Sequence, residues 1–132
     1  MKLVDDPDVE VRKMMASLIG TFKIMALGES LSHLINDRNE EVSDEALRAA
    51  GSAKMISLLP EITQQLVNRK GSYVPYLTIV SLGEAALPYL FSNVFDIKTC
   101  GTYIRTIAAI KGAEAEQTLI DIVNQGGVFM RG

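Results

Sequence analysis

The chain contains one histidine, His33, and one cysteine, Cys100, the two side chains best suited to nucleophilic or metal chemistry. A zinc site needs several converging ligands, and the sequence offers neither residue a His or Cys neighbour. A Cys–His nucleophile pair would have to join distant parts of the chain. We therefore predict that His33 lies on a solvated helix face and that Cys100 is a small, partly buried residue. We predict no catalytic, metal-binding or cofactor-binding residues.

Carboxylates gather in three segments, at residues 5–10, 40–45 and 114–121. The first two segments fall where helices are expected to begin, and carboxylates there interact favourably with the helix dipole. Their spacing does not match an EF-hand loop. We predict a structural role for these acids; a calcium site or a site for a basic partner is the alternative.

Other reaction-specific motifs are missing from the sequence. Gly126-Gly127 lacks the Gly-Lys-Ser/Thr that completes a phosphate-binding loop. No Gly-x-Ser-x-Gly elbow of the hydrolase type occurs. Because the sequence contains no set of residues whose types and spacing indicate a catalytic site, we predict that the protein is not an enzyme.

Composition and charge narrow the class of protein further. The chain has 132 residues, of which 48% are hydrophobic and 22% charged, as in an ordinary globular domain. Its net charge of −3 and pI near 5.1 argue against nucleic-acid binding, which requires clustered Lys and Arg. A single cysteine excludes an intramolecular disulfide and gives no sign of an oxidising compartment. The first ten residues turn acidic at once and have no signal-peptide pattern.

One apolar window, residues 71–94, is long enough to span a bilayer and contains only one charged residue, Glu84. Pro75, Gly83 and Pro88 interrupt it, however. These residues favour two largely buried helices separated at Gly83, and a membrane-contacting segment is the alternative.

The elements that would position any site are helices in a repeat. The segment 37–51, DRNEEVSDEALRAAG, matches the segment 6–20, DPDVEVRKMMASLIG, 31 residues earlier. Both begin with Asp and end with Gly, and weaker copies end at Gly83 and Gly112. We predict that Asp6 and Asp37 cap the first helices, with Pro7 in the first helical turn and a capping box from Asp37 to Glu40. The glycines are predicted to end these helices.

Each first helix is followed by a second amphipathic helix. The spacing predicts helices near residues 6–20, 25–36, 37–51, 55–68, 73–82, 84–94, 101–110 and 113–124, with residues 125–127 breaking the last. Pro60 either kinks its helix or marks the true start. The inward residues expected from the periodicity include Val11, Met15, Leu18, Ile19, Leu31, Leu34, Ile35, Val42, Ala46, Ala49, Ala50, Leu59, Ile62, Leu66, Leu87, Leu90, Val94, Tyr103, Ile107, Ile110, Leu119, Ile122 and Val123.

These features resemble HEAT repeats across essentially the whole chain. The Val11-Arg12 pair, the junction LGEAALPYL at 82–90 and the segment IAAIKGAEAEQTLIDIV at 107–123 carry the resemblance. It implies an all-α fold, a right-handed α-solenoid of about four HEAT-like helical hairpins, with units at about 6–36, 37–68, 69–97 and 98–125. The chain departs from the pattern where Ser43 replaces the second arginine and where the later units lack the Val-Arg pair. A continuous Asp–Arg ladder between units is therefore not expected.

The order of the units also resembles HEAT segments inside large bacterial multidomain chains that are themselves similar to ATP/ADP translocases. This resemblance implies a fragment of a longer chain and a cytoplasmic location, either free or as the cytoplasmic part of a membrane protein. We expect no membrane span within the segment itself. Apolar surface at its ends would favour self-association.

In a helical solenoid the second helices line an extended face suited to binding. The outward residues there are polar, weakly acidic and rich in amides. The candidate partner-binding residues are Glu29, His33, Asn36, Glu61, Gln64, Gln65, Asn68, Tyr89, Asn93, Gln117 and Asn124. We predict a non-enzymatic protein-interaction or scaffolding module that binds a protein partner on this face. The alternatives are a HEAT-like enzyme or enzyme subunit, of the lyase or DNA-glycosylase kind, and a purely structural spacer.

Overall fold

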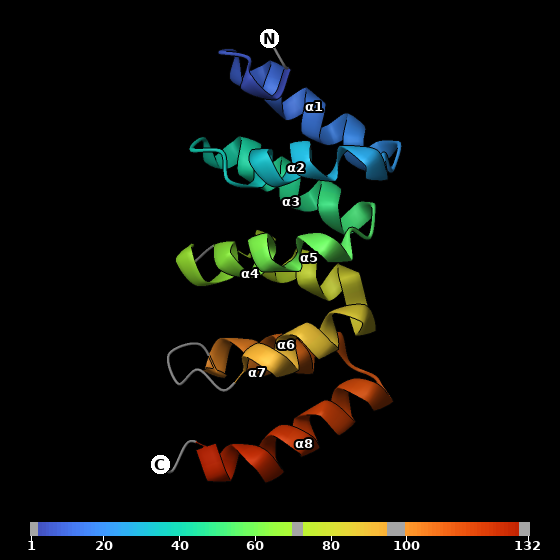
Figure 1. Ribbon diagram of the computed structural model, residues 1–132, viewed down its shortest axis with the longest axis vertical. Coiled ribbons are helices and arrows are strands. Elements are labelled where there is room, and N and C mark those ends of the chain that lie inside the picture. Colours follow the sequence, from blue (N-terminus) through green and yellow to red (C-terminus); the bar gives the residue numbers. More distant parts are fainter. Residues whose placement is uncertain (1–2, 70–72, 95–99, 130–132) are drawn as a thin grey trace. The chain divides into compact units, whose positions relative to one another are not determined.

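The computed structural model describes residues 3–69, 73–94 and 100–129, and within these ranges the chain is all-α, with no strand (Figure 1). The prediction of an all-helical fold is confirmed. The α-helices run over Val9–Thr21 (α1), Gly28–Ile35 (α2), Glu40–Ser52 (α3), Leu59–Asn68 (α4), Val74–Leu82 (α5), Leu87–Asn93 (α6), Cys100–Ile110 (α7) and Ala113–Phe129 (α8). Short 3-10 turns cover Leu3–Asp5 (η1), Met25–Leu27 (η2), Ile56–Leu58 (η3) and Gly83–Ala86 (η4).

The chain divides into two compact units, Met1–Ser81 and Leu82–Gly132, called unit 1 and unit 2 below. Each unit is described by itself. The repeat boundary expected near residues 97 and 98 lies outside the described residues.

The helix starts in unit 1 differ from the prediction by two residues. Asp8 caps α1 by accepting a hydrogen bond from the backbone N–H of Glu10, and Asn39 caps α3 in the same way. Asp6 and Asp37 are not the caps; each accepts the backbone N–H two residues further on, at 2.8 and 2.9 Å. The capping assignment was wrong because Asp, like Asn, can equally form such a local turn ahead of the helix. Pro7 accordingly lies outside α1.

The glycines at the ends of the first two repeat segments do not terminate the helices, as had been predicted. Gly20 and Gly51 lie inside α1 and α3, and both are buried. The left-handed corner residues are Lys23 and Lys54, with φ of 51° and 55°. Gly20 has a packing role instead: a Cβ placed there would lie 2.7 Å from Cα of Ala49. In the later repeats the prediction that a glycine ends the helix is confirmed. Gly83 and Gly112 have φ of +70° and +94°, a left-handed backbone conformation that an α-helix does not contain.

The second helices α2, α4 and α6 begin after 3-10 turns. Pro60 and Pro88 sit in the first turns of α4 and α6, where the missing proline N–H leaves no hydrogen bond unmade. Pro60 therefore marks the start of its helix, which decides between the two alternatives left open by the sequence.

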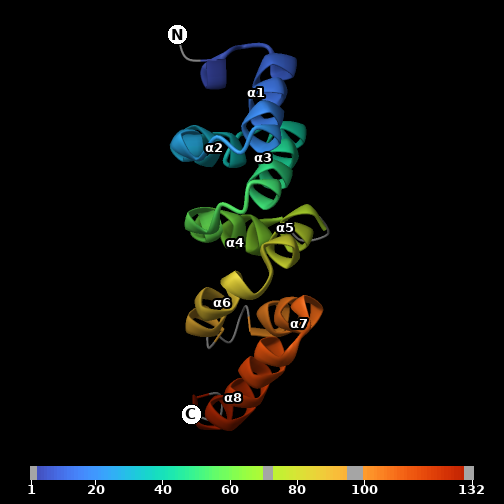
Figure 2. The same ribbon diagram turned by 90° about the vertical axis from the view of Figure 1, so that its right-hand side faces the viewer.

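The core of unit 1 lies between the first helices α1 and α3 and the second helices α2 and α4 (Figure 2). The predicted inward residues of α2, α3 and α4 are all buried: Leu31, Leu34, Ile35, Val42, Ala46, Ala49, Ala50, Leu59, Ile62 and Leu66. In α1 Ile19 is buried, Val11 and Met15 are half-buried and Leu18 is exposed. The prediction for Leu18 was wrong because α1 carries apolar residues on a second face, away from α3.

Ala46 provides a test of this core, since its side chain is fully buried. Replacing Ala46 with leucine inserts three carbons into a filled space and should lower the free energy of unfolding by about 1–3 kcal/mol. Thermal melting followed by circular dichroism would show the loss as a lower melting temperature. An unchanged melting curve would contradict the inward placement of this residue.

Unit 2 contains η4, α6, α7 and α8. Leu87, Leu90, Val94, Tyr103, Ile107 and Ile122 are buried as predicted, while Ile110 and Leu119 are half-buried. Val123 is exposed, which contradicts the prediction. The expected break at residues 125–127 is also wrong, because α8 continues to Phe129. Two adjacent glycines lower helix stability without forbidding helical φ and ψ.

The apolar window is divided at Gly83, as expected: α5 ends at Leu82, the η4 turn follows, and α6 begins at Leu87. By length and composition alone, the stretch Val74–Asn93 could cross a membrane, with a mean hydropathy of 1.3 and 39% of its window buried. A core helix of a globular protein meets the same criteria, so this stretch is weak support for membrane insertion.

Candidate functional site

The candidate site in unit 1 is a polar surface on the two second helices, called the second-helix ridge below. It consists of Glu29 and His33 on α2, of Asn36 directly after α2, and of Glu61, Gln64, Gln65 and Asn68 on α4. Within each helix these residues follow the three- and four-residue spacing that places side chains on one face. The opposite faces of the same helices are buried in the core, so the ridge is held on rigid elements.

The two halves of the ridge are joined by their amides. Nε2 of Gln65 on α4 donates to Oδ1 of Asn36, the residue that follows α2, at 3.4 Å. On α4 itself, Nε2 of Gln64 donates to Oδ1 of Asn68 at 3.3 Å. The repeat therefore brings predicted candidates from α2 and α4 into contact, and both amide pairs keep further donor and acceptor capacity.

Glu61 is the ridge residue with an unpaired buried hydrogen-bond acceptor in the described part of the chain. Its side-chain atom Oε2 is buried, and no group in the described part of the chain donates a hydrogen bond to it. A buried acceptor without a donor costs roughly 1–3 kcal/mol. This oxygen lies beneath the surface of the ridge, so its cost falls on the stability of unit 1.

A cavity of about 510 Å³ adjoins the α2 end of the ridge. Its lining residues are Val4, Asp5, Glu29, Ser30, Ser32, His33 and Asn36. Nε2 of His33 lies 3.0 Å from Oδ1 of Asp5, which links α2 to η1. His33 is exposed, as predicted, but it has a carboxylate partner that the sequence analysis did not foresee.

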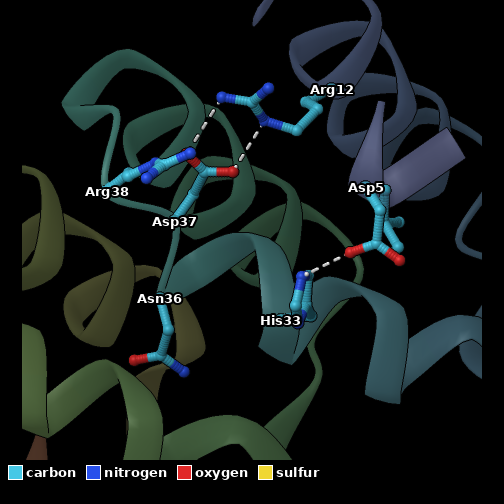
Figure 3. Close-up of a pocket in the computed structure, with 7 residues that line it drawn as sticks. Asp5, Arg12, His33, Asn36, Asp37 and Arg38 are labelled. Carbon is cyan, nitrogen blue, oxygen red and sulfur yellow. Dashed lines mark hydrogen bonds and ion pairs between the residues drawn. The ribbon is translucent and has the colours of Figure 1, made fainter. Parts of the chain in front are cut away.

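Next to this cavity, a second one of about 390 Å³ is lined in part by Arg12, Asp37 and Arg38. Nε of Arg12 donates to Oδ2 of Asp37 at 2.8 Å (Figure 3). Nη1 of Arg12 donates to the carbonyl oxygen of Asp6 at 2.7 Å. The Arg12 and Asp37 side chains are only 12% and 9% exposed. This ion pair fixes α1 to the turn that precedes α3.

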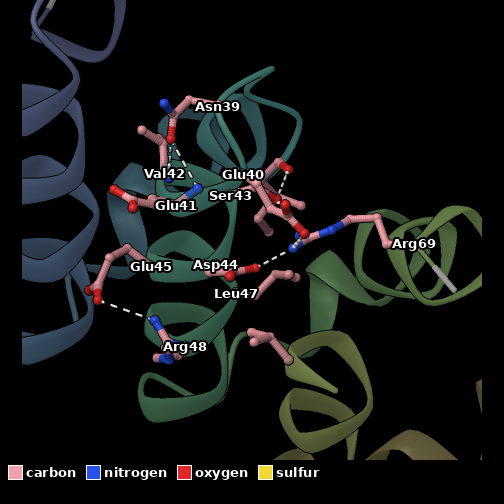
Figure 4. A network of polar contacts seen from close by, with 12 residues as sticks. Asn39, Glu40, Glu41, Val42, Ser43, Asp44, Glu45, Leu47, Arg48 and Arg69 are labelled. Atoms are coloured by element: carbon pink, nitrogen blue, oxygen red, sulfur yellow. Dashed lines mark hydrogen bonds and ion pairs between the residues drawn. The ribbon is translucent and has the colours of Figure 1, made fainter. Parts of the chain in front are cut away.

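The next polar cluster lies at the start of α3 (Figure 4). Arg69, directly after α4, donates hydrogen bonds to Glu40, Asp44 and Ser43. Burial of the Arg69 guanidinium lowers its pKa, but the hydrogen bonds with Asp44 and Glu40 outweigh this effect and the pKa is raised. Ser43 stands 31 residues after Arg12, so Arg69 brings a guanidinium to the place where the repeat lacks one.

The remaining acids of α3 pair with nearby bases. Nζ of Lys13 on α1 lies 3.4 Å from Oε2 of Glu41, and Arg48 lies 3.3 Å from Glu45 (Figure 4). The hydrogen bond with Glu41 raises the pKa of Lys13. The acidic segment at residues 40–45 is therefore largely compensated by bases of unit 1, in agreement with its structural interpretation.

In unit 2 the candidates lie on α6 and α8. Nδ2 of Asn93 donates to the carbonyl oxygen of Tyr89, and Nε2 of Gln117 donates to Asp121. Tyr89 is half-buried, while Asn93, Gln117 and Asn124 are exposed. A cavity of about 240 Å³ between α6 and α8 is lined by other residues: Glu84, Leu87, Pro88, Phe91, Glu114, Thr118 and Asp121.

His33 belongs to unit 1 and Cys100, at the first position of α7, to unit 2. Across residues 3–69, 73–94 and 100–129, no three His, Cys, Asp or Glu side chains are close enough together to hold a metal ion.

Sequence reasoning found the ridge but missed the polar groups around it. The sequence analysis treated Asp5 only as one of a group of acids near a helix start and assigned no role to Arg69. The repeat offset offered one signal for Arg12, because Asp37 opens the following unit. The separations of His33 from Asp5 and of Arg69 from Asp44 are also close to one repeat, but neither Asp5 nor Arg69 belongs to the matching segments 6–20 and 37–51.

No protein-family model matches the chain, and no curated protein or solved structure is significantly similar to it.

Proposed function

We propose that this protein is a non-enzymatic interaction module, in which a protein partner binds along the second-helix ridge. The observation that carries this proposal is the continuous polar surface formed by α2 and α4, joined through Gln65 and Asn36. Its residues are held by buried helix faces, which gives a rigid platform for recognition.

The proposal includes a solenoid architecture of the HEAT type. In unit 1, α1 packs on α3 through Gly20 and Ala49. Oγ1 of Thr78 on α5 in turn donates to the carbonyl oxygen of Leu47 on α3, at 3.2 Å. Successive first helices of unit 1 thus contact one another in chain order, which supports a solenoid. The right hand and the number of about four helical hairpins rest on the resemblance to HEAT repeats.

The chemistry of the ridge favours a polypeptide partner. Side-chain amides both donate and accept, so Asn36, Gln64 and Asn68 can pair with the N–H and C=O groups of an extended peptide backbone. The neighbouring cavity at His33 offers room for a side chain of the same peptide.

We further propose that the module acts in a bacterial cytoplasm as a regulatory or scaffolding segment of a longer chain. The likeness of its units to HEAT segments of translocase-like proteins supports this setting, as does the single cysteine. In this setting the segment does not itself span a membrane.

Site-specific photo-crosslinking tests the position of the binding face. A photoreactive amino acid at exposed Gln64 on the ridge should capture a discrete protein partner, and the same group at exposed Ser52 on α3 should not. Adding Asn68→Arg to the Gln64 probe should reduce capture, because the arginine introduces bulk and charge beside it. Equal capture from Ser52, or no capture from Gln64, would contradict the proposal.

A further inference from the structure

The cavity of about 240 Å³ between α6 and α8, called the α6–α8 cleft below, lies wholly within unit 2. Its lining side chains come from η4 and α6 on one wall, namely Glu84, Leu87, Pro88 and Phe91, and from α8 on the other, namely Glu114, Thr118 and Asp121. Apart from Pro88, the residues along each wall are spaced by three and four positions, which places side chains on one helix face. The cleft is therefore built from one face of each helix.

The apolar part of the cleft comes from α6. Leu87 is buried, Phe91 is half-buried, and Pro88 in the first turn of the helix is exposed. Their side chains offer carbon surface, including one aromatic ring, and no hydrogen-bonding group. An occupant that fits this wall must bring apolar surface of its own.

Three carboxylates accompany this apolar surface, those of Glu84, Glu114 and Asp121. Oε1 of Glu84 lies 3.3 Å from the position that a Cβ on Gly112 would take, so Glu84 reaches the corner that precedes α8. Oδ1 of Asp121 accepts a hydrogen bond from Nε2 of Gln117. In the described part of the chain none of the three acids forms an ion pair with a base, and no Lys, Arg or His lines the cleft.

The acids of α3 provide a comparison for this charge. Glu41, Asp44 and Glu45 each lie within ion-pair distance of a lysine or an arginine of unit 1. The acids of the cleft have no such counter-charge among the described residues. Because a cleft lined by one sign of charge concentrates the opposite charge, the α6–α8 cleft should attract a cation.

The arrangement of the lining residues favours one kind of cation. No three acids of the described residues are close enough together to hold a metal ion. A guanidinium instead presents five N–H donors in a planar fork, which can reach carboxylates on opposite walls. The apolar stem of an arginine suits the wall that contains Leu87, and its planar fork can stack on the ring of Phe91. A lysine ammonium is a compact point charge and would use less of the cleft.

We propose that the α6–α8 cleft binds an arginine side chain of a protein partner. The guanidinium donates to Glu114 and Asp121 on α8 and to Glu84 on the opposite wall, and the stem packs on Leu87. Because Glu84 and Glu114 are exposed, water competes for these hydrogen bonds. A single arginine should therefore bind weakly, with a Kd on the order of 1 mM that rises with salt concentration. This site belongs to unit 2 and does not depend on the second-helix ridge of unit 1.

NMR titration of the isotope-labelled full chain tests this site. The probe is Nα-acetyl-arginine amide, and the matched probe is the corresponding citrulline amide, which has nearly the same shape but no charge. The arginine probe should shift the backbone amide signals of Phe91 and Thr118 along a saturable curve. The citrulline probe should bind at least about tenfold more weakly, because it lacks the charge-assisted hydrogen bonds.

A pair of variants separates the cleft from the overall charge of the chain. Glu114→Gln removes one carboxylate from the cleft and should weaken binding of the arginine probe by about threefold to tenfold. Glu116→Gln is the matched control, because Glu116 is also exposed and in the first turn of α8 but does not line the cleft. It should leave the Kd unchanged. Circular dichroism checks that both variants are folded.

A lysine probe, Nα-acetyl-lysine amide, tests the choice of arginine. It should bind more weakly than the arginine probe, and Phe91→Leu should remove most of this difference by removing the ring. Equal binding of the two probes to the wild-type chain would overturn the assignment to arginine. The site itself would be overturned if the arginine probe gave no saturable shift, if citrulline bound equally well, or if Glu116→Gln weakened binding as much as Glu114→Gln.

Discussion

Replacing Gly20 with alanine should lower the free energy of unfolding of unit 1 by about 2–3 kcal/mol, at the upper end of the usual cost of overpacking. The added Cβ would lie 2.7 Å from both Cα and Cβ of Ala49, closer than carbon atoms can approach. Part of the obstacle is backbone, so the two helices must move apart rather than rotate a side chain. Thermal melting should show the loss as a drop of the order of 10 °C.

Gly51→Ala is the matched control for this experiment. Gly51 occupies the same repeat position 31 residues later, yet a Cβ there meets Ser81 and Thr78 at 3.5 Å, which is ordinary contact. Because alanine is the better helix former by roughly 1 kcal/mol, this variant should be neutral or slightly stabilised. Equal destabilisation of both variants would show that the close helix crossing is not specific to Gly20.

Replacing Arg12 with alanine should lower the free energy of unfolding by about 2–3 kcal/mol. Asp37 would keep its hydrogen bond from Asn39 but would lose the guanidinium that compensates its charge. With the Asp37 side chain 9% exposed, water can replace that partner only in part. Breaking one side of a buried pair costs more than the pair itself contributes.

A double-mutant cycle separates this effect from lost packing. Arg12→Ala with Asp37→Ala should be less destabilised than the sum of the two single variants. Lys13→Ala is the control, since the Lys13–Glu41 pair is 27% and 72% exposed; it should produce no measurable change in melting temperature. Strict additivity in the cycle would contradict a coupling between Arg12 and Asp37.

The sequence predicts the helices and most of the core because both depend on local periodicity. The stripes of α2, α3 and α4 are buried as expected, since each helix has one apolar face. On α1 the pattern is ambiguous: Ile19 and Leu18 are equally apolar neighbours, and only the position of α3 decides which of them is buried.

The glycines illustrate a second limit of sequence reasoning. A glycine at the end of an amphipathic segment predicts a helix stop, and Gly83 has the left-handed backbone that this requires. Gly20 and Gly51 stand at corresponding places but remain helical, because packing between helices decides their role. The requirement for glycine at position 20 arises from Ala49, 29 residues away.

For the candidate site, the exposed amides of α2 and α4 follow from helix periodicity, whereas their polar surroundings do not. The pairs His33–Asp5 and Arg69–Asp44 each include a residue outside the matching segments 6–20 and 37–51. Such contacts depend on where loops and turns place a flexible side chain. They become predictable only once the helix packing is known.

The ion pairs of Arg12 and Arg69 in unit 1 would respond differently if a helical hairpin were duplicated in tandem. Arg69 compensates Glu40 and Asp44 within the hairpin of α3 and α4, so a tandem copy of that hairpin would bring its own counter-charge. Arg12 instead depends on Asp37 of the following hairpin. Asp6 stands at the place of Asp37 one repeat earlier, so a tandem copy of the α1–α2 hairpin would offer Asp6 of the second copy to Arg12 of the first. The Arg12 pair therefore needs a following hairpin, whereas the Arg69 pair needs none.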